Sequence, residues 1–426
     1  MHYANLFTLF VLVTLRAPAF ALPRFKAGGQ NVATGKAVYV ITNAVQNAIA
    51  AMSISAKGTL STAAITPTSG QGSVALNADG KPAVPDALVG QSALTIAGQV
   101  YAAANPTMIF RLTISEHIFI VNAGSNTVSM LAISPDDPMR LQMVGQPAAV
   151  PGTFPNTVAA SVKNSMVCVA TSGSQAGVSC GMFDAVNGIG KMTAVGTFDL
   201  NQSDPPVGPT NTVSHTFFSA DESMLFTTVK GDPAVNNTGF LSVVPVQMGK
   251  NGDCSAMVGM ETRSSPNGTA VLFGSTPIPG ANPPKIFATD ASFGGAILSV
   301  DGSFQATTLA SQAIEGQKAT CWSTISSVTN SAFVTDVGVN HIVEMSLNDA
   351  SIIGQIDLSQ QQASANDPGL IDLKASGNFL YALSPGNRTS QAAISVLDVN
   401  SKQLVQHAEL GCIGVGSTAM GMAVLT

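Results

Sequence analysis

Short apolar runs that end in turn-forming residues recur along the whole chain. In the clearest copy, the run 38–42 (VYVIT) is followed by Asn43 and Asn47. Two further copies, starting at Asn122 and Asp336, keep the same spacing, which is [ND]-x3-N-x-[IV]. Asn and Asp tolerate the left-handed backbone of a tight turn, and β-branched residues suit the strands beside it. The pattern therefore predicts a series of β-hairpins.

Degenerate copies of this repeat fill the intervals between the clear ones. Their first strands are expected to end at Thr171, Lys230, Asp290 and Ser384. A period of about 50 residues fits one four-stranded blade with its loop. We therefore predict an all-β fold, a seven-bladed β-propeller of four-stranded antiparallel blades. Two β-sandwiches are the alternative, but they would need a linker near the middle, and the sequence shows none.

The final residues, 417–426, form another short β-like run. In propellers such a strand often completes the first blade, and ring closure removes free sheet edges. We expect this strand to pair with the one at 38–42. The first interval between repeats is longer than the rest, and residues 100–117 account for the excess. They are either a surface loop or translated intron from a faulty gene model.

The N-terminal residues have the pattern of a secretory signal. Residues 6–15 are almost wholly apolar, and Ala19-Phe20-Ala21 is an A-x-A cleavage site. We expect a signal peptide over 1–21 and one propeller domain over 22–426. The alternative, an uncleaved anchor, lacks the length to span a bilayer. No other long apolar run follows, so the cleaved chain is expected to have no membrane span.

Charged residues make up only 10% of the chain, and the net charge is −6. This balance argues against binding to nucleic acid, which requires basic patches. It suits a protein that is secreted to the medium or the cell wall, and that is kept soluble by hydroxyls, amides and sugars. Four N-x-S/T tripeptides in turn-like contexts are candidate glycosylation sites: Asn201, Asn236, Asn267 and Asn387.

The chain has five cysteines. Cys168 and Cys180 lie on two apolar runs joined by a Gly/Ser-rich turn, which is hairpin spacing, so we expect them to form a disulfide. The pairing of Cys254, Cys321 and Cys412 stays open. The sequence has no metal-ligand spacing, P-loop, nucleophile elbow or dinucleotide-binding pattern. We therefore expect neither a metal nor a cofactor.

Three segments resemble a known family: 91–98 (QSALTIAG), 121–130 (VNAGSNTVSM) and 177–180 (GVSC). They are similar to secreted fungal proteins described as 3-carboxymuconate cyclase-like, within the lactonase propeller family (6-phosphogluconolactonase and carboxymuconate lactonizing enzyme). The resemblance covers most of the mature chain. It implies a seven-bladed propeller and a lactonase or cycloisomerase ancestry.

The resemblance also implies candidate site residues. The family's enzymes carry an Arg-His pair on an inner strand and an Asn-Glu pair at the end of the next. Here Ser214 takes the Arg place, His215 keeps the His, and Lys230 stands in the Glu place. Asn156 stands where a second family His is expected. Arg388 resembles the family's substrate-binding Arg.

Each of these residues has a functional and a structural interpretation. His215 is the candidate catalytic acid or base, or else a hydrogen-bonded residue that lines the central channel. Lys230 is a candidate to bind an anion or form a Schiff base, or else a solvated turn lysine. With Asn156 and Arg388, Lys230 would bind a small lactone or carboxylate.

Two functions of different class follow. The first is a secreted propeller with an eroded catalytic set, which binds a cell-wall or host partner with weak or no catalysis. The alternative is an active extracellular lactonase or 3-carboxymuconate cyclase-type cycloisomerase that works at the channel mouth near His215. Cyclisation of a polycarboxylate needs cations around the substrate, usually arginines. Because Ser214 and Lys230 replace an Arg and a Glu, the sequence favours the eroded site.

Overall fold

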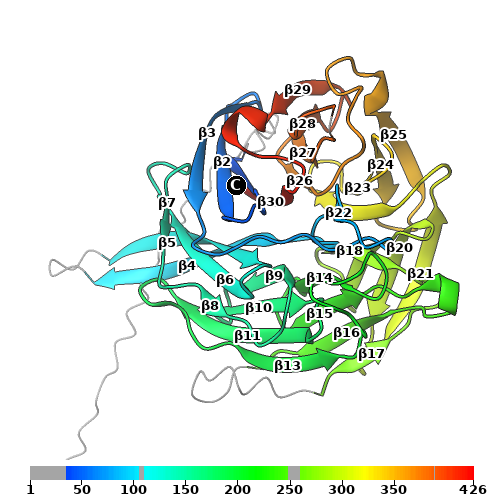
Figure 1. The fold of residues 1–426 in the computed structure, drawn as a ribbon, viewed down its shortest axis with the longest axis horizontal. Coiled ribbons are helices and arrows are strands. Elements are labelled where there is room, and N and C mark those ends of the chain that lie inside the picture. The colour runs from blue at the N-terminus through cyan, green and yellow to red at the C-terminus, as the bar shows by residue number, and fades with distance from the viewer. Residues whose placement is uncertain (1–34, 105–109, 248–259, 388) are drawn as a thin grey trace, which may run out of the picture. The chain divides into compact units, whose positions relative to one another are not determined.

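A computed structural model describes residues 35–104, 110–247, 260–387 and 389–426. The described strands form seven antiparallel sheets, the blades of a propeller (Figure 1). Five blades have four strands each, and the second and third blades have five. The strands, blade by blade, are β1 (Ala37–Ile41), β2 (Ala48–Ile54), β3 (Leu60–Pro67) and β30 (Met420–Leu425); β4 (Leu94–Ala104), β5 (Phe110–Asn122), β6 (Thr127–Ile133), β7 (Leu141–Met143) and β8 (Ala148–Ala149); β9 (Pro155–Ser161), β10 (Met166–Thr171), β11 (Ala176–Asp184), β12 (Gly188–Ile189) and β13 (Thr193–Phe198); β14 (Val213–Phe218), β15 (Met224–Val229), β16 (Phe240–Pro245) and β17 (Thr262–Ser264); β18 (Leu272–Pro277), β19 (Lys285–Asp290), β20 (Gly294–Val300) and β21 (Ala306–Ala313); β22 (Thr320–Ser326), β23 (Ser331–Asp336), β24 (His341–Ser346) and β25 (Ile352–Asp357); β26 (Leu373–Ser376), β27 (Phe379–Ser384), β28 (Ala393–Asp398) and β29 (Leu404–Glu409).

The C-terminal strand closes the ring. β30 pairs antiparallel with β1, with Ala37 opposite Leu425, and becomes the innermost strand of the first blade. The innermost strands β30, β4, β9, β14, β18, β22 and β26 contact one another in turn, and β26 returns to β30. The predicted seven-bladed propeller and its closure by the last strand are therefore confirmed.

All seven predicted turn positions lie at the end of the second strand of a blade, or within two residues of it. Because these second strands run in the same direction, their ends gather on one face of the ring, which we call the anchor face. Here the repeat residues bind neighbouring blades. Asn122 Oδ1, for example, accepts hydrogen bonds from Asn47 Nδ2 (3.0 Å) and Thr68 Oγ1 (2.7 Å).

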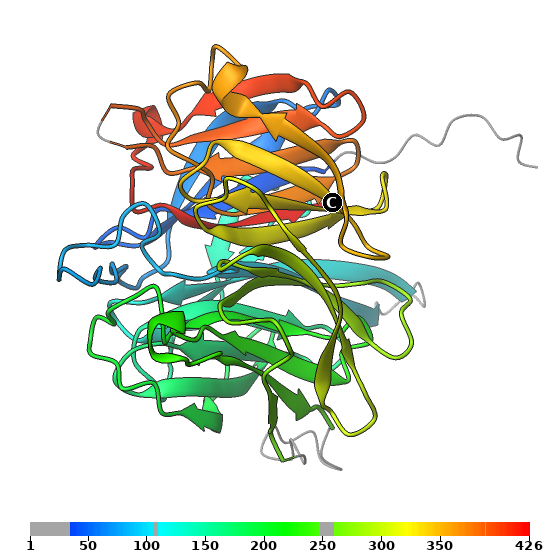
Figure 2. The ribbon, with the colours of Figure 1, turned by 90° about the vertical axis from the view of Figure 1, so that its right-hand side faces the viewer.

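Burial changes from the centre of the ring to its rim. Second strands such as β10 are buried at every residue, whereas the outer strand β21 alternates between buried or half-buried and exposed residues. Strands sandwiched between two blades need apolar residues on both faces, while an outermost strand needs them on one. Figure 2 shows these stacked, twisted sheets from the side.

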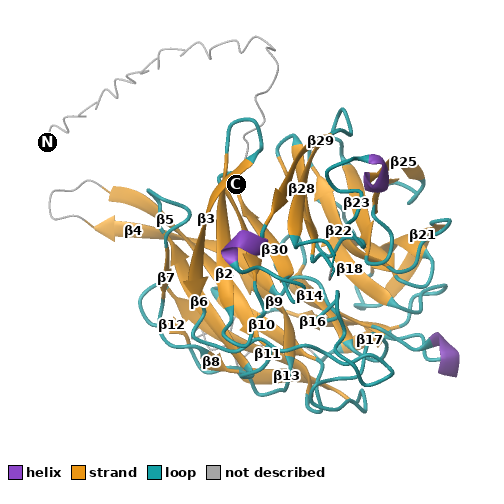
Figure 3. Cartoon of the chain, turned by 45° about the horizontal axis from the view of Figure 1, so that its top comes forward, coloured by secondary structure: helices purple, strands orange, loops and turns teal. Residues whose placement is uncertain are grey.

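In the part of the chain that the structure describes, helical structure is confined to short turns. The described residues include the 3-10 helices η1 (Pro233–Val235), η3 (Leu358–Gln360) and η4 (Gly411–Ile413), and Figure 3 shows how little of the fold they make up. Among the described residues, no helix is long and apolar enough to cross a bilayer.

The long first interval has two sources. Strands β4 and β5 pair without a break from Leu94 opposite Ile120 to Ala104 opposite Phe110. Residues 100–117, for which a surface loop and translated intron were the two alternatives, therefore extend a β-hairpin, except for 105–109, which lie outside the described residues. The second source, which the repeat analysis missed, is the connection 68–93 between β3 and β4.

Candidate functional site

The connection between β3 and β4 fills the centre of the propeller. Figure 1 shows this stretch of chain, coloured blue, crossing the middle of the ring between β22 and β14. Within it, residues 87–92 form what we call the plug. Ala87, Leu88, Val89 and Gln91 each expose 2% or less of their surface.

Inner strands from three blades bind the plug. The Gln91 side chain exchanges two hydrogen bonds with the Ser323 backbone on β22, of 3.1 and 3.0 Å. Its backbone N–H donates to the Ser214 carbonyl on β14 at 2.7 Å. On β9, the Val158 N–H donates to the Ser92 carbonyl at 2.8 Å. Since an unpaired buried backbone group costs about 1–3 kcal/mol, these bonds hold the plug as part of the core.

Two plug residues have left-handed backbones. Val89 has φ +49° and Ser92 has φ +62°. A positive φ is an outlier for a β-branched residue such as Val89, and it persists only where surrounding contacts enforce it. The plug's path is therefore determined by its contacts rather than by local preference.

His215, the candidate catalytic residue, lies on β14 directly against the plug. Its Nε2 is 2.9 Å from Ser92 Oγ, and its Nδ1 accepts a hydrogen bond from the Ser275 backbone N–H at 3.2 Å. The imidazole also stacks on the Phe217 ring, with 4.8 Å between ring centroids. Only 4% of the residue is exposed.

These bonds define the protonation state of His215. Because Nδ1 accepts, the ring is a neutral imidazole that donates from Nε2 to Ser92. Burial lowers the pKa of His215 well below its usual value, and the positive charge of Lys374 on β26 lowers it further. A histidine in this state is a poor proton donor near neutral pH.

A cavity of about 240 Å³ lies beside the His215 ring. Its walls include Ser92 of the plug, Thr95 of β4 and the turn after β14, where Glu222 lies. The Glu222 carboxylate already accepts hydrogen bonds from Ser161 Oγ and from the Lys163 backbone N–H. Because the turn after β14 lies at the end of the channel opposite the anchor face, the cavity lies at that end too.

Asn156 and Lys230 also bind the plug. Asn156 Nδ2 donates to the Leu88 carbonyl at 3.2 Å and to the Val213 carbonyl at 2.7 Å, and the residue is fully buried. Lys230 Nζ donates to the Val89 carbonyl. The structure thus brings His215, Asn156 and Lys230 together, and all three form hydrogen bonds to the plug.

The interpretation of Lys230 as a solvated turn lysine is wrong. Only 1% of the residue is exposed, and its Nζ lies 4.4 Å from the centroid of the Phe273 ring. Burial lowers the pKa of Lys230, while the nearby Asp86 carboxylate opposes that shift. The sequence placed Lys230 at a strand end but did not show that the plug covers this end.

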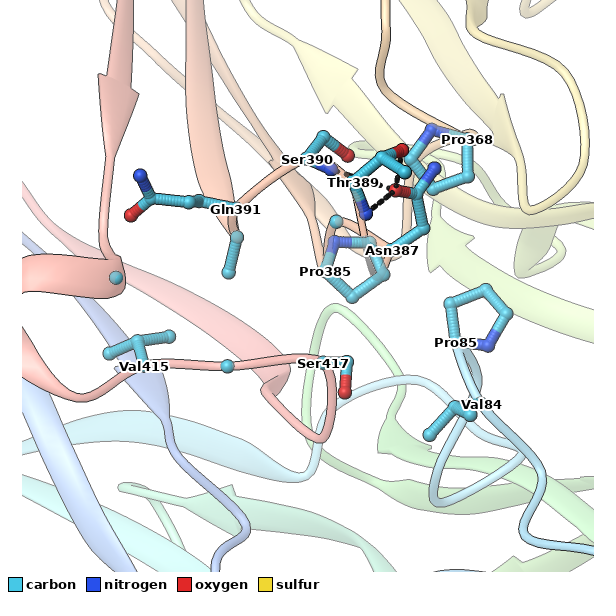
Figure 4. Close-up of a pocket in the computed structure, with 14 residues that line it drawn as sticks. Val84, Pro85, Pro368, Pro385, Asn387, Thr389, Ser390, Gln391, Val415 and Ser417 are labelled. Carbon is cyan, nitrogen blue, oxygen red and sulfur yellow. Dashed lines mark hydrogen bonds between the residues drawn. The ribbon is translucent and has the colours of Figure 1, made fainter.

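Arg388, the remaining candidate, lies outside the described residues. Its neighbour Asn387 lines a pocket of about 580 Å³ on the anchor face (Figure 4). Val84 and Pro85, which precede the plug, form the opposite wall. The described lining residues carry no charged side chain, and the Ser390 hydroxyl has no hydrogen-bond partner.

The cysteines and glycosylation candidates lie apart from the plug. Cys168 on β10 and Cys180 on β11 are directly opposite in register and form a disulfide, with 4.1 Å between their Cα atoms. Cys321 is a buried free thiol and Cys412 an exposed one, while Cys254 lies outside the described residues. The four Asn candidates are all exposed, in turns or loops: Asn201, Asn236, Asn267 and Asn387.

The part of the chain that the structure describes contains no group of three or more His, Cys, Asp or Glu side chains that could hold a metal ion. The plug is the main feature that sequence reasoning missed. Its signals were the long first interval and the apolar triplet Ala87-Leu88-Val89 between turn-forming residues.

Solved structures share this fold at low sequence identity. The periplasmic gluconolactonase of Pseudomonas aeruginosa matches with a TM-score of 0.56 and 14% identity, over 91% of this chain and 99% of that one. A functionally unknown protein from Desulfotomaculum acetoxidans matches with a TM-score of 0.52 and 11% identity, over 92% and 99%. No protein-family model and no curated protein matches the sequence. The shared property is the seven-bladed propeller of lactonase-type structures.

Proposed function

We propose that this chain is a non-catalytic propeller of the lactonase fold that acts outside the cell as a binding protein. The observation that carries the proposal is the plug. It occupies the centre of the ring, and His215, Asn156 and Lys230 all hydrogen-bond to it. A substrate would have to displace a buried, bonded segment to reach His215 or Asn156 from the anchor face.

The electrostatics of the site support this proposal. Cyclising a polycarboxylate needs fixed cations close to the reacting carboxylate. Of the arginines whose side chains are described, Arg140 lies next to β7 and Arg263 on β17, both near the outer edge of a blade. Lys230, the cation nearest the plug, already donates to the Val89 carbonyl.

Three features support an extracellular location. The disulfide Cys168–Cys180 is stable in oxidising compartments and rare in the cytosol. Four exposed glycosylation sequons and a surface of few charges suit the secretory route. The N-terminal signal pattern is consistent with the same route.

Assays on purified secreted protein test the absence of catalysis. We expect neither 3-carboxymuconate cyclisation nor lactone hydrolysis above background, either for the wild type or for His215→Ala. The matched control is Lys81→Ala, a change at an exposed residue on the same connection. Turnover that His215→Ala abolishes and Lys81→Ala retains would establish the alternative, an enzyme that works through the cavity beside His215.

The pocket in Figure 4 is the proposed binding surface. Among its described lining residues, the exposed polar side chains of Gln391 and Ser417 fit a neutral polyhydroxylated ligand such as a cell-wall glycan. A Cβ atom added at the lining residue Gly416 meets no heavy atom within 4 Å, so Gly416→Phe should place its ring at the pocket without disturbing the fold.

Co-sedimentation with insoluble β-glucan and chitin tests this binding. We expect Gly416→Phe to weaken sedimentation at least tenfold. Gly302→Phe, at another turn glycine with equally free space, should leave it unchanged. Equal sedimentation of both variants, or none by the wild type, would overturn the assignment of this pocket to a glycan.

A further inference from the structure

A second cavity lies beside the plug, on the side of blades 4 to 6. Its volume is about 200 Å³. Most of its lining is apolar, including Val271, Phe273, Ala319 and Val337. Of the described residues that line it, only Lys230 and Asp86 have charged side chains. An amine and a carboxyl at the wall of a small apolar cavity are a recurring arrangement for carbonyl chemistry.

Lys230 lines this cavity, and its amine has a lone pair available for reaction when it is neutral. Among the described residues, its hydrogen bond goes to the Val89 carbonyl, and the centroid of the Phe273 ring lies 4.4 Å away. A neutral amine has two hydrogens and a lone pair, so the bond to Val89 leaves the lone pair available. Burial lowers the pKa of Lys230, which raises the share of this nucleophilic form.

Asp86 supplies the matching acid. Asp86 lines the cavity and its carboxylate accepts hydrogen bonds from the backbone N–H groups of Val89 and Gly90, while its Oδ1 has no hydrogen-bond partner among the described residues. Burial raises the pKa of Asp86, although the Lys230 charge opposes the shift, so the carboxyl can carry a proton closer to neutral pH than an exposed aspartate. The remaining nucleophile candidate, Cys321, stays a thiol because burial raises its pKa.

We propose that this cavity captures small, uncharged, largely apolar aldehydes or ketones as an imine on Lys230. The Nζ lone pair attacks the carbonyl carbon, the C–N bond forms, and a proton moves from nitrogen to oxygen to give a carbinolamine. Asp86 then protonates the departing hydroxyl, and one water leaves as the C=N bond forms. The resulting iminium returns its N–H proton to Asp86. The net change is amine plus carbonyl to imine plus water, with no oxidation.

The size of the cavity restricts the ligand. An apolar cavity of roughly 150 Å³ takes up benzene in other proteins. The cavity beside Lys230, at about 200 Å³, therefore has room for an aromatic ring with a formyl group. A ligand with its own carboxylate would meet Asp86 in an apolar setting and be disfavoured. This inference does not rest on the proposed function. Val84 and Pro85 line both this cavity and the pocket in Figure 4, but Lys230, where the imine would form, lines only this cavity.

Reductive trapping tests the proposal. The full-length secreted protein is incubated with benzaldehyde and sodium cyanoborohydride, and adducts are mapped by peptide mass spectrometry. We expect a mass gain equal to benzaldehyde less one oxygen at Lys230, at concentrations where the exposed Lys57, Lys81 and Lys191 stay unmodified. Glyoxylate, the charged control aldehyde, should not show this preference for Lys230.

Two variants identify the roles. Lys230→Arg keeps the charge and a donor for the Val89 carbonyl but cannot form an imine, so its adduct should be absent. Asp86→Asn should slow trapping on the order of 10²-fold, as expected when a general acid is lost. Asp79→Asn, at an exposed aspartate on the same connection, should not slow it.

A further measurement needs no variant. In urea-unfolded wild type, the preference for Lys230 over the exposed lysines should disappear, because it depends on the folded cavity. Adducts that form only at exposed lysines in the native protein, or equal labelling of Lys230 in native and unfolded protein, would overturn the proposal.

Discussion

At the scale of single residues, the polar groups at the centre of the ring bind the plug. His215 has both ring nitrogens engaged, by Ser92 and by the Ser275 backbone. Such a buried, neutral histidine leaves a measurable signature in the pH dependence of stability. Since its pKa is lowered by folding, the unfolded chain binds a proton that the native ring does not.

The first prediction concerns this signature. Above about pH 6.5 the ring is neutral in both states, so His215 contributes no pH dependence. As the pH falls below that value, the native state should lose up to about 1.4 kcal/mol per pH unit relative to a variant without the histidine. Urea denaturation of wild type and His215→Gln, at several pH values from 7.5 down to 5, measures the difference.

Other titrating groups, such as Asp86, are common to both proteins and cancel in this comparison. A difference that stays flat across the range would mean that His215 titrates normally in the folded protein. The ring would then be solvated, and its assignment as a neutral donor to Ser92 would be incorrect.

The candidate residues were predictable from the resemblance, but their environment was not. His215, Asn156 and Lys230 were selected in the sequence, and the structure does bring them together. What they bind, the plug carbonyls of Leu88 and Val89 and the Ser92 hydroxyl, comes from a segment without strand periodicity. Hydrophobic patterning detects strands and helices, so it does not reveal a coil that is buried by tertiary contacts alone.

At the scale of elements, the plug behaves as an extra inner layer shared by blades 3, 4 and 6. Gln91 is its main anchor, because its side-chain amide satisfies both backbone groups of Ser323. The same residue's backbone N–H is bonded to the Ser214 carbonyl. The plug should therefore open only when these bonds break together.

The second prediction is that Gln91→Ala loosens the plug. The Ser323 N–H loses its partner, and its carbonyl keeps only a long bond of 3.4 Å from the Thr276 hydroxyl, at a cost of about 3 kcal/mol. Hydrogen exchange at the plug amides should then accelerate on the order of 10²-fold. Gln71→Ala, at an exposed glutamine earlier in the same connection, serves as control and should leave exchange unchanged. Unaltered exchange in Gln91→Ala would show that the plug is held by its apolar residues alone.

The third prediction concerns the β10–β11 hairpin. The disulfide closes a short loop, since Cys168 and Cys180 are 12 positions apart. Replacing both by Ser should cost about 3 kcal/mol, mainly by freeing the unfolded chain. Thermal unfolding under non-reducing conditions measures the loss. Cys412→Ser, which alters an exposed free thiol, should leave the midpoint in place; an equal fall in both variants would point to general thiol effects instead.

At the scale of the whole molecule, the repeat predicted the architecture because each copy is set by local chemistry. The Asn or Asp at the end of a second strand forms or caps its own turn, as when Asp290 accepts from the backbone N–H of Ser292. The number of blades then follows from counting turns. The number of strands per blade was harder to predict, since β8 and β12 are two-residue pairings with no pattern of their own.

The fourth prediction tests ring closure. Deleting residues 418–426 removes β30 and exposes the buried faces of β1, β4 and β26. We expect the truncated chain to aggregate or to lose its cooperative thermal transition, because an open ring has an unpaired central edge. Deleting only Thr426, an exposed residue beyond the strand, is the control and should preserve the transition. A stable monomer without β30 would show that the other six blades suffice.

The fifth prediction concerns the surface as a whole. With charged residues at only 10% of the chain, solubility has to come from neutral polar groups and attached sugars. We expect protein secreted from a eukaryotic host to begin at Leu22 and to lose mass on treatment with an endoglycosidase.

Single Asn→Gln changes at Asn201, Asn236, Asn267 and Asn387 should each remove one increment of that mass wherever the site is occupied. All four side chains are exposed, so the folded protein has room for a glycan at each site. Intact mass spectrometry measures the mass lost in each variant. A mature N-terminus at Met1, together with a mass unchanged by deglycosylation, would show that the chain does not follow the secretory route.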